Sequence, residues 1–232
     1  MSQIINCHNL SLIYPVNFNT KLKSLPNFLG GKLDLSSGSI LSLNQINITF
    51  NIGDRVAITG HNGSGKSTLL RVLAGIYQPT TGTVSFDFPF KITTAFDHAY
   101  GLDYELSGLD NIKIRFLSDH NNSNYEKFLV DVKSISGIGD YINLPVRTYS
   151  TGMVTRLMVG YLLALKSEVL MIDEGINFAD SDFHAKVDGL IFNYINTTKL
   201  MVIATHDEQF IRKYCNRIIK MESGSIVGDF YV

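Results

Sequence analysis

A glycine-rich segment at residues 60–68 holds the strongest chemical signal in the chain. Its residues are Gly60, His61, Asn62, Gly63, Ser64, Gly65, Lys66, Ser67 and Thr68. They fit the pattern G-x-x-x-x-G-K-[ST], whose glycines let backbone N–H groups curl around phosphates with no Cβ in the way. In this pattern Lys66 reaches the terminal phosphates of a nucleotide, and the Ser67 hydroxyl binds Mg²⁺. The alternative interpretation is an ordinary glycine-rich turn from a strand into a helix, but the full pattern in that setting favours nucleotide binding.

Two acidic residues follow a short apolar run further along the chain. The run at 169–172 predicts a buried strand, and Asp173 and Glu174 would stand at its carboxyl end, where ligands bind on an open α/β sheet. An apolar strand that ends in acids is common and is often only solvated, but here it accompanies the phosphate-binding segment. We therefore expect Asp173 to hold the Mg²⁺ shell and Glu174 to orient and polarise the attacking water.

Two further segments carry side chains suited to a nucleotide site. The sequence Arg-Thr-Tyr-Ser-Thr-Gly-Met at 147–153 precedes a long helical stretch, with Ser150 at the predicted N-cap and Gly152 in the first turn. Such a helix start binds anions, although a simple N-cap would look the same. His206 follows the apolar run at 200–204, so it is expected at the tip of another strand.

The order of these segments resembles that of the ABC ATPases. The segment at 147–153 resembles the signature motif of that family, usually written L-S-G-G-Q, and in particular the Y-S-[ST]-G-M variant of bacterial polysaccharide exporters. The resemblance implies ATP as the substrate, Mg²⁺ as the cofactor and a head-to-tail homodimer. In that dimer each phosphate-binding loop would face Ser150 and Gly152 of the other copy, so both residues are expected to bind nucleotide.

The resemblance also implies roles for three residues outside these motifs. His206 resembles the switch histidine that senses the γ-phosphate and helps to order Glu174 and the water. Tyr14 ends the strand predicted at 4–14 and matches the aromatic residue that stacks on adenine; the alternative is a tyrosine on an amphipathic strand. Asp180 lies six residues past Glu174, the spacing of the aspartate that contacts the opposite subunit, but a helix N-cap is an equal alternative.

The chain departs from the family pattern in two places. Most members carry a glutamine after the strand that here ends at Phe96, and Asp97 or His98 occupies that place. Polysaccharide exporters often have an acid there, so we assign Asp97 to the metal site. Gly175 replaces the proline that commonly follows the catalytic glutamate.

The composition indicates a folded protein with no strong overall charge. The 232 residues are 45% hydrophobic and 18% charged, and the formal net charge of −1 argues against nucleic acid as a partner. Cys7 and Cys215 are expected to be free thiols in a reducing compartment. From residues 1–10 we expect no leader sequence, and no apolar stretch reaches spanning length, so we expect a partner to hold the chain at any membrane.

Hydrophobic periodicity predicts strands that alternate with helices, and hence a parallel sheet covered on both faces. We expect strands at 4–14, 40–50, 55–59, 83–88, 91–96, 169–172 and 200–204, a hairpin at 217–230, helices at 66–75, 182–195 and 208–214, and a helical period over roughly 105–165. With the resemblance, this predicts an α/β fold of the P-loop NTPase (RecA-like) type: a parallel core, an antiparallel β subdomain and an α-helical signature subdomain.

One ABC ATPase domain is expected over 1–232, with the helical subdomain at roughly 97–165 and an insertion at roughly 15–39. The insertion is loop-like, with one short helix expected near 22–29. Its apolar side chains suit a segment that docks on a partner or a membrane surface, or one that covers an edge of the domain's own core.

The leading hypothesis is an ATPase that drives export of a lipid-linked polysaccharide, such as O-antigen or a related glycan, through a separate membrane permease. It would sit peripherally on the cytoplasmic face of the bacterial inner membrane. Transport of another substrate, such as teichoic acid or a drug, is the alternative within the family. A soluble ABC ATPase acting on DNA or ribosomes is disfavoured because the sequence has neither a long coiled-coil insertion nor a tandem ATPase domain. A GTPase is disfavoured because it has no Asn-Lys-x-Asp segment.

Overall fold

The computed structural model describes residues 2–15, 32–34, 38–96, 101–118, 124–173 and 181–232. The chain folds as two compact units. The first unit comprises Met1–Thr94, Val169–Glu174 and Lys199–Val232, and the second comprises Ala95–Glu168 and Gly175–Thr198. Each unit has its own layers and its own core, so each is described by itself.

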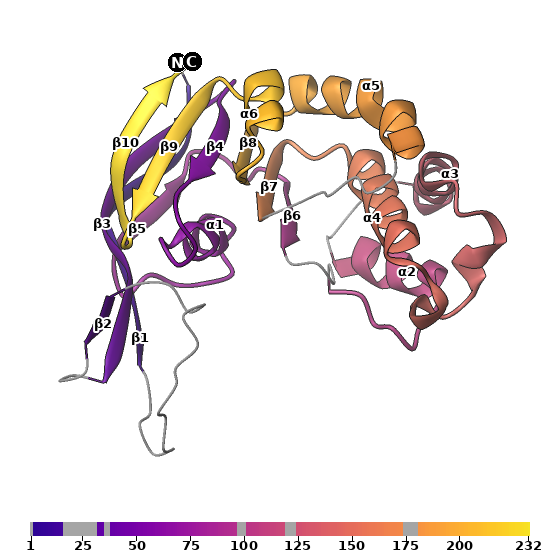
Figure 1. The fold of residues 1–232 in the computed structure, drawn as a ribbon, viewed down its shortest axis with the longest axis horizontal. Helices are drawn as coiled ribbons and strands as arrows, with labels where there is room; N and C mark the ends of the chain where they lie inside the picture. Colours follow the sequence, from indigo (N-terminus) through magenta and orange to yellow (C-terminus); the bar gives the residue numbers. More distant parts are fainter. Residues whose placement is uncertain (1, 16–31, 35–37, 97–100, 119–123, 174–180) are drawn as a thin grey trace. The chain divides into compact units, whose positions relative to one another are not determined.

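A six-stranded sheet forms the centre of the first unit (Figure 1), in the order β10-β9-β4-β8-β7-β6. The strands are β4 (Arg55–Thr59), β6 (Ile92–Phe96), β7 (Val169–Asp173), β8 (Leu200–Ala204), β9 (Arg217–Glu222) and β10 (Ser225–Tyr231). The run β9-β4-β8-β7 is parallel, and β10 pairs antiparallel with β9. β7 and β8 are buried along their whole length, which explains their unbroken apolar sequences. The parallel core is confirmed.

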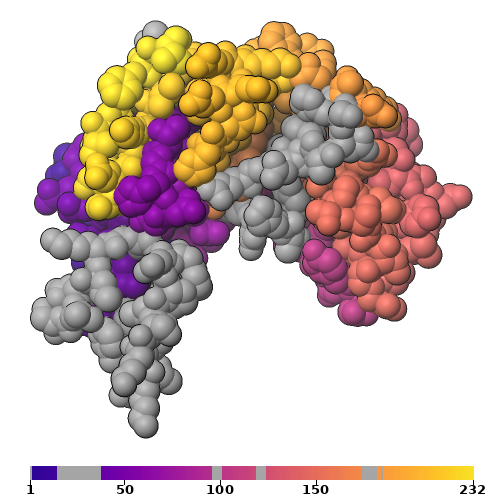
Figure 2. Space-filling view, in the orientation of Figure 1, coloured from indigo at the N-terminus to yellow at the C-terminus, as the bar shows by residue number. Residues whose placement is uncertain are grey.

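A four-stranded antiparallel sheet forms the other layer of this unit, in the order β2-β3-β1-β5. Its strands are β1 (Gln3–Pro15), β2 (Lys32–Asp34), β3 (Ser39–Asn51) and β5 (Thr81–Phe86). Helix α1 (Lys66–Leu73) packs against β7 and β8 of the larger sheet and against β3 of the smaller one. Figure 2 shows the C-terminal segment, in yellow, beside the purple surface of an earlier part of the chain.

The second unit is helical. Its helices are α2 (Gly108–Ser118), α3 (Tyr125–Ser136), α4 (Thr151–Leu165) and α5 (Ser181–Thr197), with short 3₁₀ turns η2 (Gly139–Asn143) and η3 (Val146–Thr148). The rings of Phe116, Tyr125, Phe128 and Tyr161 form its aromatic core. A Cβ at Gly160 would lie 2.9 Å from the Val132 carbonyl oxygen, so the glycine permits close contact between α3 and α4.

Helix α4 is apolar because it is enclosed by the rest of the unit and not because it meets lipid. Most of its residues between Val154 and Leu165 are buried, as expected for a helix that is hydrophobic nearly all round. None of the helices in the described part of the chain combines the length and the apolar character needed to cross a bilayer.

The observed elements differ from the predicted ones mainly at their ends. β5 covers Thr81–Phe86 and not 83–88, and α2 starts at Gly108 and not at 105. The Asn111 side chain explains the later start: its Oδ1 accepts from the Asp103 N–H at 2.8 Å, and its Nδ2 donates to the Asp103 and Ser107 carbonyls. These bonds hold the preceding loop out of the helix. The helix expected near 22–29 and most of the insertion lie outside the described residues.

Candidate nucleotide-binding site

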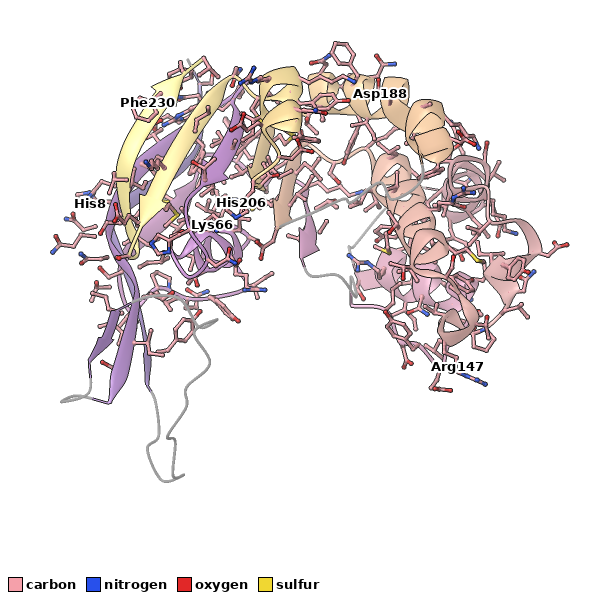
Figure 3. The ribbon with its side chains drawn as sticks, viewed as in Figure 1. His8, Lys66, Arg147, Asp188, His206 and Phe230 are labelled. Carbon is pink, nitrogen blue, oxygen red and sulfur yellow. The ribbon has the colours of Figure 1, made fainter. Side chains whose placement is uncertain are left out.

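Three strands of the first unit end level with one another and bring the predicted residues to one edge. Ala204, the last residue of β8, is in register with Ile58 of β4 and with Asp173, the last residue of β7. The loop that opens at Gly60 and the residue His206 follow directly from these ends. Figure 3 labels Lys66 and His206, which follow the ends of the paired strands β4 and β8.

The loop conformation requires its glycines. Gly60 has φ 147° and Gly65 has φ 102°, both in the region that favours glycine. A Cβ at Gly60 would collide with the Met221 carbonyl oxygen, and one at Gly65 would lie 2.8 Å from the Ser42 carbonyl oxygen. The loop is therefore closed against β9 and β3, and no side chain fits at these two positions.

The turn between β9 and β10 braces the loop from behind. The Gly224 N–H donates to the Ser64 carbonyl oxygen at 2.9 Å, and the Gly224 carbonyl accepts from the Asn44 N–H at 2.9 Å. Sequence reasoning missed this contact because Gly224 is far from the loop in the chain, and its only local signal is that of a hairpin turn.

Lys66 lies inside the loop. Its Nζ donates to the carbonyl oxygens of Gly60 at 2.9 Å and His61 at 3.1 Å, and the residue is buried. The helix that starts at Lys66 has no side-chain cap on its first turn and no acidic residue there. No capping side chain and no acidic residue of the helix itself thus occupies this positive end, which suits an anion-binding helix start.

Ser67 and Asp173 meet as the sequence predicts for a Mg²⁺ site. The Ser67 Oγ donates to Asp173 Oδ1 at 2.8 Å, and Arg71 Nη2 lies 3.7 Å from Asp173 Oδ2. No group of three or more His, Cys, Asp or Glu side chains that could hold a metal occurs in the described ranges. A hydroxyl and one carboxylate nevertheless fit Mg²⁺, which takes one or two protein oxygens and completes its shell with water and substrate phosphates. Asp97, the other predicted ligand, lies outside the described residues.

Arg71 is the residue of this group that sequence reasoning missed. It lies four residues after Ser67 on α1 and therefore on the same face of the helix. That spacing could have identified it once Ser67 and Asp173 were paired. With Ser67 on one oxygen and Arg71 near the other, the Asp173 carboxylate is held on both sides.

His206 sits between two anchored neighbours. The Thr205 Oγ1 accepts from the Asp207 N–H at 3.1 Å, and Asp207 caps α6 (Glu208–Tyr214) by accepting from the N–H groups of Gln209 and Phe210. The His206 side chain is exposed at this edge, where a terminal phosphate could reach it. Glu174, which His206 is expected to help order, lies outside the described residues, as do Asp180 and His98.

Tyr14 lies against α1. The ring is half-buried and meets Tyr77 edge-on, with centroids 6.0 Å apart and an interplanar angle of 82°. Burial raises the pKa of the Tyr14 phenol, and a hydrogen bond with the Thr68 side chain partly opposes that shift. Thr68 in turn accepts from the Ser42 hydroxyl at 2.9 Å. The predicted adenine-stacking residue is thus tied to the last residue of the phosphate-binding segment, and Tyr77 is a neighbour that sequence reasoning missed.

The predicted signature segment starts a helix in the second unit. Ser150 has extended backbone angles and accepts from the Met153 N–H at 3.2 Å, so it is the N-cap of α4. Gly152 lies in the first turn, where a Cβ would have only the Ser150 Oγ within 4 Å, at 3.9 Å. The first turn of α4 has no acidic residue. This end of α4 therefore has the character of an anion-binding helix start.

Comparison with known proteins accounts for this set of features. The family model described as ABC transporter matches residues 43–177. The O-antigen export system ATP-binding protein RfbE of Yersinia enterocolitica is 36% identical over 227 residues, which is 94% of each chain. The teichoic acids export ATP-binding protein TagH of Lactococcus lactis subsp. lactis is 31% identical over 183 residues, covering 78% of this chain and 39% of TagH.

A solved structure shares the fold. The dimeric post-hydrolysis state of the ATP-binding cassette MJ0796 bound to ADP and Pi aligns with a TM-score of 0.75 at 21% identity, over 98% of both chains. The family model spans more than half of the chain, and RfbE matches nearly all of it. The chain therefore belongs to the ABC transporter family, of which it is an ATPase subunit.

Proposed function

We propose that this chain is the ATP-hydrolysing subunit of a transporter that exports a lipid-linked polysaccharide, O-antigen or a related glycan, across the cytoplasmic membrane. The ATPase part rests on one observation above the others, the Ser67–Asp173 hydrogen bond, which joins the phosphate-binding loop to the acid-tipped strand. The export part rests on the match to RfbE, which extends over 94% of both chains.

Each residue at the strand edge has a place in this reaction. The backbone N–H groups of the loop and the Lys66 ammonium bind the phosphates of ATP. Ser67, Asp173 and Asp97 are the proposed Mg²⁺ ligands, and the ion, when bound, neutralises charge on the transferring phosphate. Glu174 orients the attacking water and takes up its proton, and His206 contacts the γ-phosphate.

The active form is proposed to be a head-to-tail homodimer. The positive helix start at Ser150 and Gly152 would bind the nucleotide held by the other copy's loop. Closure of the dimer around ATP would move a membrane permease, and hydrolysis would reset it. The chain would act peripherally, at the cytoplasmic face of the inner membrane, through that permease.

Transport of teichoic acid is the second candidate, because TagH is 31% identical over 78% of this chain. Genetic replacement separates the two. Cells that carry Glu174→Gln in place of the natural chain should accumulate the lipid-linked polymer on the cytoplasmic side, and the natural chain should restore export. Accumulated lipid-linked O-antigen supports the proposal, and an accumulated teichoic acid precursor supports the second candidate. If neither polymer accumulates although the purified variant has lost its ATPase activity, both candidate functions are contradicted.

A mixed dimer tests the arrangement of the two copies. In a dimer of one Lys66→Ala chain and one Gly152→Ala chain, one nucleotide site should combine an intact loop with an intact signature. The other site should combine both changes. About half of the normal ATPase rate is expected from such a dimer if its sites turn over independently. Equal damage at both sites would contradict the head-to-tail arrangement.

A further inference from the structure

In the second unit, the segment just before α4 (residues 146–149) is paired with the leading segment, residues 103–107, which precedes α2. The Val146 N–H donates to the Leu106 carbonyl at 2.9 Å, and the Arg147 N–H donates to the Tyr104 carbonyl at 3.0 Å. An exposed ion pair between Arg147 and Glu105, at 3.3 Å, lies over the same pairing. Figure 3 labels Arg147 at the outer end of this unit, near the start of α4.

The leading segment is itself held firmly to α2. The buried Asn111 side chain bonds both the N–H and the carbonyl of Asp103, as well as the Ser107 carbonyl. The Asp110 N–H donates to the Ser107 hydroxyl at 3.0 Å and so caps the helix. The leading segment and the start of α2 are therefore held together as one hydrogen-bonded piece.

Tyr149 joins this piece to the signature through its hydroxyl group. The hydroxyl donates to the Tyr141 carbonyl at 2.7 Å and lies against Gly108, the first residue of α2. Burial raises the pKa of this phenol, so the group stays protonated and able to donate. The half-buried ring thus meets two backbone segments at once.

The absence of a side chain at Gly108 leaves the space that the Tyr149 hydroxyl occupies. A Cβ at this position would collide with the Tyr149 Oη and would lie 3.2 Å from the Ile142 carbonyl oxygen. The backbone conformation of Gly108 is an ordinary helical one, so the need for glycine here comes from the space that the tyrosine occupies.

Ser150 follows Tyr149 directly and caps α4. One peptide bond separates the anchored ring from the side chain proposed to meet the partner's nucleotide. Because that peptide is planar and the Ser150 side chain is bonded to the Met153 N–H, a shift of the Tyr149 backbone would be passed on to Ser150, and the anchored ring opposes such a shift.

We propose that Tyr149 is the positioning residue of the signature: its hydroxyl, bonded to the Tyr141 carbonyl and packed on Gly108, fixes the place of Ser150 relative to the start of α2. The proposal rests on the proposed role of Ser150 in the partner's site. It assigns no contact between Tyr149 and the nucleotide. Its effect should therefore appear in turnover and not in ATP binding to the same chain's loop.

The test is Tyr149→Phe in the full chain, assembled with its permease. This change keeps the ring and removes the hydroxyl, with its hydrogen bond to the Tyr141 carbonyl and its contact with Gly108. The kcat for ATP should fall about tenfold, comparable to the loss of one net hydrogen bond, while ATP affinity stays within about twofold. Tyr141→Phe is the matched control, because it removes an exposed hydroxyl and leaves the accepting main-chain carbonyl in place. Its kcat should equal that of the natural chain.

A double-mutant cycle with Gly108→Ala separates positioning from general support. Gly108→Ala alone should lower kcat by pushing the tyrosine aside, and it should add much less in the Tyr149→Phe background, where the Oη is gone. The proposal would be overturned if the effects of the two changes were additive, or if Tyr149→Phe left kcat unchanged. It would also be overturned if the fall in kcat came with a lower melting temperature and a weaker ATP affinity, because the variant would then be destabilised as a whole.

Ser150→Ala, measured in parallel, distinguishes this proposal from the function on which it rests. If Ser150→Ala lowers kcat and Tyr149→Phe does not, only the positioning role is wrong. If neither lowers kcat, the proposed role of the signature is wrong as well.

Discussion

At the scale of single residues, the site side chains already hold one another in place. Lys66 donates to carbonyls of its own loop, and Ser67 donates to Asp173. The ammonium and the hydroxyl are thus fixed close to where phosphate and Mg²⁺ would bind, which lowers the cost of ordering them on binding. Binding then needs only an exchange of partners and no rebuilding of the loop.

Lys66→Ala should lower ATP affinity by about 100-fold, since it removes charge-assisted hydrogen bonds to the terminal phosphates. Equilibrium binding of a fluorescent ATP analogue would measure the change. Lys220→Ala, on the exposed side of β9 in the same unit, is the charge-matched control and should bind normally. An unchanged affinity in Lys66→Ala would refute the assignment of the loop.

Tyr14 allows the ring to be tested apart from its hydroxyl. Tyr14→Phe removes the bond to Thr68 but keeps the aromatic face, so the KM for ATP should change by less than about threefold. Tyr14→Ala removes the face and should raise the KM about tenfold, in line with the loss of base stacking. If both variants raise the KM equally, the hydrogen bond to Thr68 matters and stacking on adenine does not; if neither raises it, Tyr14 has no role in ATP binding.

At the scale of elements, a hairpin turn supports the phosphate-binding loop. Ser223 and Gly224 have φ 46° and 82°, the two positive values of a tight hairpin turn that matches the twist of its strands. Gly224 also lies against Ser42 of β3 and donates to the loop at Ser64. One turn therefore closes the β9–β10 pair and fixes the back of the nucleotide site.

Gly224→Ala should destabilise the protein by about 2 kcal/mol, because alanine is strained at this φ and its Cβ would meet the Ser42 carbonyl. Urea unfolding would measure the loss, and ATP affinity should fall with it. Ser223→Gly is the control at the neighbouring position: it relieves a positive φ and should leave stability within about 1 kcal/mol. Equal effects from both changes would remove the special role of Gly224.

At the scale of the whole molecule, an ion cluster around the buried Arg217 and Asp54 side chains connects the two sheets of the first unit. Arg217 of β9 donates to Asp54 at 2.7 Å and to the Thr49 carbonyl of β3. Its Nε and Nη2 donate to the two carboxylate oxygens of Asp229 on β10. The hydrogen bond to Asp229 is the largest cause of the raised pKa of Arg217. The Tyr231 hydroxyl lies 3.2 Å from Asp54, so the end of β10 is joined to the cluster as well.

Arg217→Ala should cost about 3 to 5 kcal/mol of unfolding free energy, since it leaves the buried Asp54 carboxylate without its cation. Chemical denaturation followed by circular dichroism would measure it. Arg212→Ala is the matched control, because its ion pair with Glu208 is exposed on both sides and should contribute nothing measurable. A loss from Arg217→Ala no larger than that of the control would show that the cluster does not stabilise the sheets.

The sequence by itself determined the features that depend on neighbours along the chain. The phosphate-binding loop, the acid at the end of β7 and the Ser150 cap were predicted at the residues where the structure has a loop, a strand end and a cap. Each depends on short-range chemistry: glycine angles, an apolar run and a hydroxyl that accepts from its own helix. The roles assigned to Asp97, Glu174 and Asp180 stay predictions.

Only the tertiary structure decided which distant residues complete these features. Gly224 behind the loop, Arg71 beside Asp173, Tyr77 against Tyr14 and the fit of Tyr149 on Gly108 carry little local signal. A glycine in a turn or a tyrosine near a helix start fits many environments. Its partner is chosen when sheets and helices bury their apolar faces together, and that choice depends on contacts between segments far apart in the chain.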